Sequence, residues 1–470
     1  MKRQRVLVTI SISFSIRYLI RTGLLKKMKD FCEPVVALAW NQEDLISELR
    51  QEGFEVHIIP EPKKAVAYSN TRRKIDIWFD HFCLNSVSKK IQQDYLEQYL
   101  PFKSRLLRKA REGYNIAKLH LPFQRRRLFK KEEELLQTAT NFDEISTFVD
   151  TLEIDAVFTV TPFHRQEDLL LRACKLKRKK MITSILSFDN ITKRGWIPVE
   201  YDCYIVWNEQ NKEQLQRIYP FTKNKPVHIC GPAQFDFYFD QQYLLEQCAW
   251  KKMVGINEGD ERKIILYAGG PKELFPYEPC YLKEMDEAIE KGLIRYKAVV
   301  LFRCHPMDHI ERWKKVVGKS NNIIFDDSWN GKESTGYTNV SSADIKKLCS
   351  TLAYTDVHIN LCSTMTVDGS VFHKPQIGPA YAHNKKYKGE LLAQMYRQEH
   401  FVPISDSGVL QLAYSKEEMI RSINHALETG VSDGCKNEKM LKRVINFTDG
   451  KSTERVADIL KDCLARENCY

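Results

Sequence analysis

The sequence lacks an apolar run long enough to cross a membrane, and no Asp-x-Asp motif follows any of its expected strands. Its most apolar stretch, from Val6 to Leu25, is interrupted by Arg17 and Arg21, whereas a spanning helix needs about 20 apolar residues. This stretch also lacks the small-residue cleavage site of a signal peptide. We therefore expect a cytoplasmic protein without a membrane-spanning segment.

Closely paired cysteines are also missing. The chain has 13 cysteines, an odd number, at irregular spacings and without a C-x-x-C pair. Zinc sites usually show such pairs, and disulfide frameworks belong to small secreted domains. The sequence therefore predicts buried thiols in a reducing compartment, with no metal site.

Charge is unevenly distributed along the 470 residues. With 43% hydrophobic and 28% charged residues the chain is of ordinary globular composition, which excludes a wholly disordered protein. The formal net charge is +11, but the segment from Lys63 to Lys131 holds 18 Lys+Arg against 5 Asp+Glu and accounts for the whole excess. The rest of the chain is close to neutral.

Short apolar runs alternate with helical segments over most of the chain, which predicts βαβ units and parallel sheets buried on both faces. Residues 63–150 interrupt this alternation with long helical segments such as Ile91–Arg111, and Gly231-Pro232 marks a boundary. We expect an α/β protein with two tandem Rossmann-like domains, residues 1–231 and 232–470, and a helical basic insert at about 63–150. The expected strands are Val6–Ile10, Val35–Trp40, Phe54–Ile59, Ala156–Val160, Met181–Leu186, Tyr204–Trp207, Val227–Cys230, Lys263–Tyr267, Ala298–Phe302, Asn322–Phe325, Val357–Asn360 and Gln376–Gly378.

Ligands of open α/β sheets bind beyond the carboxyl ends of the strands. In the second domain, Gly269 and Gly270 follow one strand, and their backbone N–H groups could approach a phosphate or simply form a turn. Arg303, His305 and Pro306 follow the next strand. There a guanidinium and an imidazole could hold a phosphate, and Pro306 could be the first residue of a helix.

A third loop of the second domain, after Val357–Asn360, carries hydroxyl groups. Ser363 and Thr364 could present side-chain and backbone donors to an anion at the start of a helix, or Ser363 or Thr364 could merely cap that helix. Asp368, one turn into it, is placed to accept hydrogen bonds from ribose hydroxyls.

Two loops of the first domain hold candidates for a general base. His164 follows Ala156–Val160, and Asp189 follows Met181–Leu186. Either side chain could remove the proton of an acceptor hydroxyl, and either could instead be a structural turn residue.

Together these residues resemble the two-domain GT-B glycosyltransferase fold. His305-Pro306 and Ser363-Thr364 are similar to the HP and SS/ST motifs of bacterial sialyltransferases and Kdo transferases, and the cell-wall glycerophosphotransferases carry similar elements. The resemblance implies that both motifs hold the nucleotide phosphate of the donor. It also implies that the C-terminal domain binds the nucleotide, that the N-terminal domain binds the acceptor, and that the reaction occurs in the cleft between them.

We therefore expect a glycosyltransferase that moves a sugar from a CMP- or UDP-linked donor to a surface glycan or lipid-linked acceptor, without a metal or other cofactor. His305 would stabilise the departing phosphate. A glycerophosphate transferase using CDP-glycerol is the nearest alternative, and a non-catalytic protein that binds nucleotide or glycan is a third.

The basic insert interleaves aromatic and basic side chains. Such a surface would suit anionic lipid headgroups at the inner face of the membrane, an anionic glycan or nucleic acid. Alternatively, it is a solvated face without a partner. No nucleic-acid module accompanies it, so we do not expect nucleic acid. The candidate membrane or acceptor patch comprises Arg125, Arg126, Arg127, Lys130 and Lys131.

Overall fold

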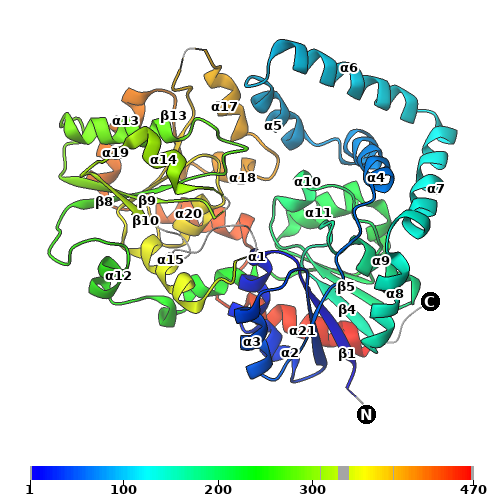
Figure 1. Ribbon diagram of the computed structural model, residues 1–470. Helices are drawn as coiled ribbons and strands as arrows, with labels where there is room; N and C mark the ends of the chain where they lie inside the picture. The colour runs from blue at the N-terminus through cyan, green and yellow to red at the C-terminus, as the bar shows by residue number, and fades with distance from the viewer. Residues whose placement is uncertain (1–2, 307, 327–337, 385, 467–470) are drawn as a thin grey trace. The chain divides into compact units, whose positions relative to one another are not determined.

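The computed structural model describes residues 3–306, 308–326, 338–384 and 386–466, which form two α/β units (Figure 1). Unit 1 comprises the chain up to Lys89, Tyr99–Gln234 and the chain from Lys451. Unit 2 comprises Lys90–Gln98 and Phe235–Gly450. The main boundary lies three residues beyond Gly231. Two short segments differ from the expected domains, because residues 90–98 of the insert group with unit 2 and the last helix groups with unit 1.

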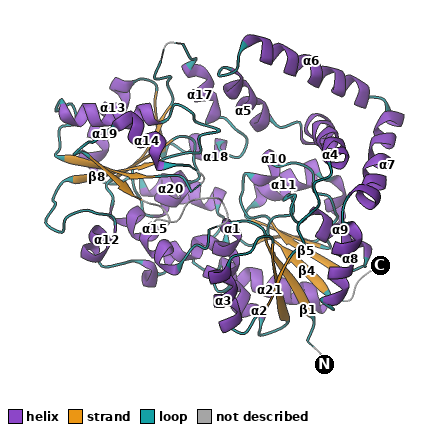
Figure 2. Ribbon diagram, in the orientation of Figure 1, coloured by secondary structure: helices purple, strands orange, loops and turns teal. Residues whose placement is uncertain are grey.

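Unit 1 contains a seven-stranded sheet in the order β3-β2-β1-β4-β5-β6-β7, in which every pair of neighbours is parallel. The strands are orange in Figure 2, where β1, β4 and β5 of this sheet are labelled. Its β-branched runs are buried on both faces, as a parallel sheet requires. Val6 and Val8 of β1 face one core and Leu7 the other. The strands are β1 (Arg5–Ile10), β2 (Glu33–Leu38), β3 (Glu55–Ile58), β4 (Ala156–Thr159), β5 (Lys180–Ser184), β6 (Cys203–Val206) and β7 (Val227–Ile229).

Helices cover both faces of this sheet. One core includes side chains of α2, α3 and the C-terminal helix α21, which is red in Figure 1 and lies against α2. The other core includes side chains of α8, α9 and α11. The helical elements of these layers are α1 (Ser13–Ile16), the π-helical turn η1 (Arg17–Arg21), α2 (Leu24–Met28), α3 (Glu43–Gln51), α8 (Phe142–Thr151), α9 (Asp168–Leu176), α10 (Asn190–Lys193), α11 (Glu209–Ile218), the 3-10 turn η3 (Pro220–Asn224) and α21 (Ser452–Ala465).

The insert is helical, as expected, but it is broken more often than the sequence pattern predicted. The segment expected at Ile91–Arg111 is two helices, because Pro101 precedes the second and cannot continue the first. The elements of the insert are α4 (Val66–Phe79), the π-helical turn η2 (Asp80–Leu84), α5 (Val87–Glu97), α6 (Phe102–Leu119) and α7 (Pro122–Ala139). No helix among the described residues is long and apolar enough to span a bilayer.

A buried cluster of charges ties the insert to the Rossmann core of unit 1. Glu132 of α7 accepts hydrogen bonds from Arg72 of α4 (3.1 Å) and Arg172 of α9 (2.8 Å). Asp168 of α9 pairs with the same two arginines at 3.4 and 2.9 Å, and both guanidinium groups lie over the ring of Trp196. Buried charges need such compensation, so this cluster determines how α4 and α7 dock on α9.

Unit 2 contains a six-stranded parallel sheet in the order β10-β9-β8-β11-β12-β13. Trp250 of α12 packs with Val299 and Leu301 on one face, and Trp313 of α14 stacks on Phe302 on the other. The strands are β8 (Lys263–Ala268), β9 (Ala298–Arg303), β10 (Ile323–Asp326), β11 (Val357–Asn360), β12 (Gln376–Pro379) and β13 (Leu410–Ala413). The helical elements are η4 (Ala233–Phe239), η5 (Gln241–Tyr243), α12 (Gln247–Met253), α13 (Pro279–Glu290), α14 (Ile310–Val317), α15 (Ser342–Tyr354), α16 (Met365–Val371), α17 (Gly389–Met395), α18 (Val402–Ser405), α19 (Lys416–Thr429) and α20 (Gly434–Val444).

The Glu132→Gln substitution tests the role of the charge cluster. It removes the buried carboxylate that both arginines share, and breaking a buried ion pair costs about 3–5 kcal/mol. We expect a loss of that size in the free energy of unfolding, measured in urea. Glu134→Gln, an exposed position on the same helix, is the control and should change stability by less than about 0.5 kcal/mol. Equal stabilities for the two variants would contradict the assigned role.

Candidate functional site

The strand order reverses at one point in each sheet. In unit 2, β8 lies between β9 and β11, and in unit 1, β1 lies between β2 and β4. Because the strands are parallel, the loops after β8, β9 and β11 meet at one edge of the second sheet, and those after β1 and β4 at one edge of the first. The structure therefore brings the predicted donor residues of the second domain to a common edge.

The loop after β8 contains Gly269 and Gly270. Their N–H groups already have internal acceptors, the carbonyl of Arg303 at 3.0 Å and the carboxylate of Glu278 at 2.8 Å. A Cβ atom on Gly269 would lie 2.8 Å from the ring of Trp313, and one on Gly270 would lie 2.6 Å from a neighbouring ring. The glycines are thus explained by close packing, and the expected phosphate contacts of their amides are not supported.

Glu278, directly before α13, is a buried carboxylate at this edge that the sequence did not single out. Besides the Gly270 amide it accepts a hydrogen bond from the Tyr267 hydroxyl at 3.3 Å, and the Arg312 guanidinium lies 3.8 Å away. Burial raises the pKa of Glu278 to about 8, although the Gly270 amide and Arg312 oppose the shift. This side chain therefore changes charge near neutral pH, which is unusual for a carboxyl group.

The loop after β9 carries three predicted donor residues with different surroundings. Arg303 is buried and donates to Asp326 at 2.7 Å, so its guanidinium serves an internal ion pair, contrary to the expected role at a phosphate. Burial lowers the pKa of His305 to about 4, so its imidazole is neutral at pH 7. Pro306 does not begin a helix as expected, because a turn closed by the Asp308 amide and the His305 carbonyl (2.9 Å) comes before α14.

The loop after β11 is held in an unusual backbone conformation. Cys362 has a positive φ of 45°, which costs a non-glycine residue about 1–3 kcal/mol and persists only where the surroundings impose it. Asn360 accepts hydrogen bonds from the Ser363 amide (3.1 Å) and the Thr366 hydroxyl (3.0 Å), while its own buried Nδ2 has no partner among the described residues. The side-chain oxygen of Asn360 therefore holds the loop in position, and its Nδ2 group at the end of β11 is left as a hydrogen-bond donor.

Ser363 and Thr364 differ in how they relate to α16. The Ser363 hydroxyl accepts a 3.3 Å hydrogen bond from the Met365 amide. Thr364 is exposed and occupies the N-cap position, but within the described chain its side chain makes no capping bond. The capping alternative therefore applies to Ser363 only, and the Thr364 hydroxyl faces solvent.

Asp368 does not have the surroundings expected of a ribose ligand. It is buried in unit 2 and accepts a hydrogen bond from the Tyr238 hydroxyl of η4. The expected contact with ribose is therefore not supported, because the carboxylate is engaged inside the unit.

In unit 1, His164 lies in the turn that follows β4. Its Nδ1 is buried without a hydrogen-bond partner among the described residues. Burial lowers the pKa of His164 to about 4, with a smaller contribution from the positive charge of Arg194. At neutral pH the imidazole is therefore uncharged and has a lone pair with which to accept a proton, as the predicted base must.

Asp189, the other predicted base, is more strongly engaged. Its Oδ1 accepts hydrogen bonds from the Ser187 hydroxyl at 2.6 Å and the Asn190 side chain at 3.2 Å, and Lys193 lies 3.5 Å from its Oδ2. These contacts are those of a residue that organises the turn before α10. Asp189 and His164 thus differ in their surroundings, and the role of the base stays a prediction for both.

A hydroxyl cluster at the edge between β1 and β4 was missed from the sequence. Glu167 is fully buried and accepts hydrogen bonds from Thr9 (2.9 Å), Thr159 (2.5 Å) and Thr161 (2.6 Å), and burial raises its pKa. Directly after β1, the buried hydroxyls of Ser13 and Ser15 have no partner among the described residues. The alternating serines at positions 11, 13 and 15 are the signal in the sequence, but the apolar residues of the surrounding stretch from Val6 to Leu25 obscure it.

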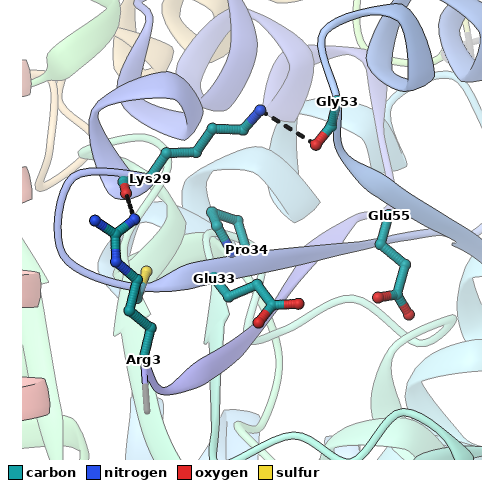
Figure 3. A pocket seen from close by; sticks show the side chains of 7 residues that line it. Arg3, Lys29, Glu33, Pro34, Gly53 and Glu55 are labelled. Atoms are coloured by element: carbon teal, nitrogen blue, oxygen red, sulfur yellow. Dashed lines mark hydrogen bonds between the residues drawn. The ribbon is translucent and has the colours of Figure 1, made fainter. Parts of the chain in front are cut away.

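A pocket of about 340 Å³ lies at the opposite edge of the first sheet (Figure 3). Its lining includes Arg3, Glu33 and Glu55, at the amino ends of β1, β2 and β3, and the Lys29 ammonium bonds to the Gly53 carbonyl at 3.2 Å. Ligands of such sheets bind at the carboxyl ends, so this pocket is not part of the candidate site.

One family model matches the chain. It is described as CDP-Glycerol:Poly(glycerophosphate) glycerophosphotransferase and matches residues 179–461, which is more than half of the sequence and includes the loops after β5, β8, β9 and β11. No curated protein matches the chain.

Solved structures share the fold over nearly the whole chain. The S. aureus MnaA-UDP co-structure has a TM-score of 0.54 at 11% identity and covers 99% of this chain and 97% of its own. UDP-GlcNAc 2-epimerase from Neisseria meningitidis bound to UDP-GlcNAc has a TM-score of 0.55 at 10% identity, and the match covers 97% of this chain and 100% of the epimerase chain. A glycosyltransferase from Rickettsia africae ESF-5 has a TM-score of 0.51 at 13% identity, and the match covers 99% of this chain and 100% of the glycosyltransferase chain. The expected two-domain GT-B fold is confirmed.

The Glu278→Gln substitution tests the buried carboxyl group. Because the folded-state pKa is about 8 and the unfolded value about 4.5, the folded protein binds more protons between these values, and ionisation destabilises it as pH rises. Between about pH 5 and pH 8, wild type should lose stability relative to Glu278→Gln by up to about 1.4 kcal/mol per pH unit. Urea unfolding at several pH values measures this difference. Glu290→Gln, an exposed position on α13, is the control, and parallel pH curves for wild type and Glu278→Gln would contradict the prediction.

Proposed function

Because the chain belongs to the CDP-glycerol:poly(glycerophosphate) glycerophosphotransferase family, we propose that it transfers glycerophosphate or a related alditol phosphate from a CDP-linked donor to an acceptor hydroxyl. The observation that carries the proposal is the family match over residues 179–461, which contains His305-Pro306 and Ser363-Thr364 at the ends of strands on either side of β8. The chain is an enzyme that acts on a nucleotide-linked substrate. Sugar transfer, expected first from the sequence, uses the same class of donor, and the family favours phosphate transfer.

The proposed reaction is a displacement at phosphorus. The acceptor oxygen attacks the phosphorus atom that carries the glycerol, and a new P–O bond forms. The bond from that phosphorus to the bridging oxygen breaks, so that CMP leaves with the bridging oxygen, and the acceptor proton passes to a base. The protein must position both substrates and stabilise the charge that develops on the leaving phosphate.

Residues of unit 2 are proposed to bind the donor. The neutral imidazole of His305 can donate one hydrogen bond to a phosphate oxygen, and an adjacent diphosphate would favour its protonated form. The exposed hydroxyl of Thr364 and the orphaned Asn360 amide are further donors at the same edge. We assign the Ser363 amide to positioning, because it is bonded to Asn360. Catalysis without a metal stays a prediction.

Residues of unit 1 are proposed to bind the acceptor. The unpartnered hydroxyls of Ser13 and Ser15 are polar groups suited to a hydroxylated ligand at the edge between β1 and β4. His164 follows β4 and has an unpartnered Nδ1, so it is the proposed base.

A donor panel tests this function. Purified enzyme and a polyol-phosphate acceptor are incubated with CDP-glycerol, CMP-sialic acid or UDP-N-acetylglucosamine in the presence of EDTA, and nucleotide release and acceptor extension are measured. We expect CMP release with CDP-glycerol only, and extension of the acceptor by glycerophosphate. Transfer from a nucleotide sugar alone would refute phosphate transfer. Loss of activity in EDTA that added Mg²⁺ restores and added Zn²⁺ does not would refute metal-independent catalysis.

Two histidine variants separate the donor and acceptor roles. His305→Ala should lower kcat/KM for CDP-glycerol by about 10²–10³, as for the loss of one donor to a developing negative charge. His164→Gln should lower kcat by about 10²–10⁴ while CMP binding is unchanged. His425→Ala, exposed on α19, is the matched control. Activity of His164→Gln equal to that of the control would remove His164 as the base.

We also propose that the insert contacts an anionic membrane surface. Along α6 the side chains of Phe102, Leu106, Leu107 and Tyr114 are 60–71% exposed, and they recur on one side of the helix at helical spacing. Basic residues flank them on α6, and Arg126, Arg127, Lys130 and Lys131 on α7 are exposed, whereas Arg125 is half-buried over Trp78. Apolar anchors with flanking cations suit anionic headgroups, at about 1 kcal/mol per basic residue.

Vesicle sedimentation tests this surface. The double substitution Leu106→Ser and Leu107→Ser should reduce binding to vesicles of phosphatidylcholine with phosphatidylglycerol at least tenfold, and CMP binding should be unchanged. Leu176→Ser replaces an equally exposed leucine of α9 and is the matched control. Binding of wild type to a soluble polyanionic glycan but not to the vesicles would instead assign the surface to the acceptor.

A further inference from the structure

Three metal-ligating side chains meet in unit 1, outside the candidate site. Cys203 comes from β6, His228 from β7 and Cys463 from α21, and one ligand atom of each lies within 4.8 Å of the others. Both cysteines are buried and the histidine is partly buried. The residues are separated by 25 and 235 positions in the sequence, so no short spacing motif could reveal them.

The fold explains why these side chains meet. In the parallel pairing of β6 and β7, Ile205 lies opposite His228. Side chains two residues apart share a face, so Cys203 and His228 point to the same side of the sheet. Cys463 belongs to the face of α21 that packs in the same core as Cys203, together with Leu460. The helix therefore presents its thiol directly to the two strand residues.

A fourth donor is close by. Cys230, two residues after His228, belongs to the same buried core as Cys203 and Cys463. The core under α21 thus contains three thiols and one imidazole.

Metals bind the thiolate form of cysteine and the neutral form of histidine. Binding of an ion by this cluster would therefore release the protons of the thiol groups.

We propose that Cys203, His228 and Cys463 bind one Zn²⁺ ion, with Cys230 as the fourth ligand. Zinc bonds to sulfur at about 2.3 Å and to nitrogen at about 2.0 Å, so the donors of a tetrahedral site lie about 3.5–3.8 Å apart. Cys203, His228 and Cys463, whose ligand atoms lie within 4.8 Å of one another, can meet this spacing with small side-chain movements. A disulfide between Cys203 and Cys463 would involve two of these side chains and would not account for the position of His228 beside them. The mixed sulfur and nitrogen donor set is that of structural zinc sites.

Such a site would fasten the C-terminal helix to unit 1. The chain returns to this unit only at Lys451, and α21 covers the core with Val456 and Leu460. Cys203 and His228 come from the sheet, Cys230 directly follows β7, and Cys463 comes from the helix, so the ion would link the two layers. This inference does not depend on the proposed catalytic activity.

Metal analysis of the full-length, untagged protein tests the proposal. After expression with zinc and gel filtration, we expect about one zinc per chain by mass spectrometry of the metal. Cys463→Ser and His228→Ala should each lower the zinc content at least tenfold. Cys174→Ser, which replaces a buried thiol of unit 1 in the opposite core, is the matched control and should retain zinc.

A measurement on wild type keeps the test valid if a variant fails to fold. Co²⁺ replaces zinc and should produce a thiolate-to-cobalt charge-transfer band, and bound metal should protect Cys203 and Cys463 from alkylation while the exposed Cys248 and Cys435 still react. Zinc-free protein without a cobalt band would overturn the proposal. A Cys203–Cys463 disulfide found by peptide mapping of protein purified without oxidant would also overturn it.

Discussion

The parallel arrangement of both sheets is the constraint on which the rest of the structure depends. Parallel strands place all their carboxyl ends at one edge, and the reversal of strand order at β1 and at β8 leaves a position there that no crossover helix covers. His164 and the serines after β1 share one such edge, and His305 and Thr364 share the other. The chemistry proposed for the chain follows from this arrangement. His164 is far in sequence from the serines after β1, and His305 is far from Thr364, so only the sheets bring the members of each set together.

Buried carboxylates support both edges, and each is stabilised in a different way. Glu167 is surrounded by threonine hydroxyls, Glu278 by a backbone amide and a tyrosine, and Glu132 by two arginines. Burial raises the pKa values of Glu167 and Glu278, and their hydrogen bonds from hydroxyls and an amide oppose that shift. Glu132 instead pairs with two arginines, which fix the position of its side chain. Glu167 and Glu278 lie beside the candidate site, whereas Glu132 lies where the insert packs on unit 1.

The sequence predicted what depends on local pattern. All twelve expected strands are present, most within two residues of their expected ends, because apolar β-branched runs are buried on both faces. β13 was missed because the exposed Gln411 interrupts its apolar run. The partners of Arg303 and Asp368, which are Asp326 and Tyr238, could not be predicted because they are distant in sequence, and the expected donor-binding roles of both residues stay predictions. The buried position of Glu132 could not be predicted from the basic run around Arg125, because its partners Arg72 and Arg172 are also distant in sequence.

The return of α21 to unit 1 has a consequence for how the protein is made. The chain passes from one unit to the other four times, at residues 89, 98, 234 and 450. Val456 and Leu460 complete a core whose other members include Val6 and Val8. During synthesis the first sheet therefore emerges from the ribosome long before the helix that covers one of its faces. Its apolar surface must stay protected until α21 has been translated, so the order of synthesis and the order of folding are opposed in this unit.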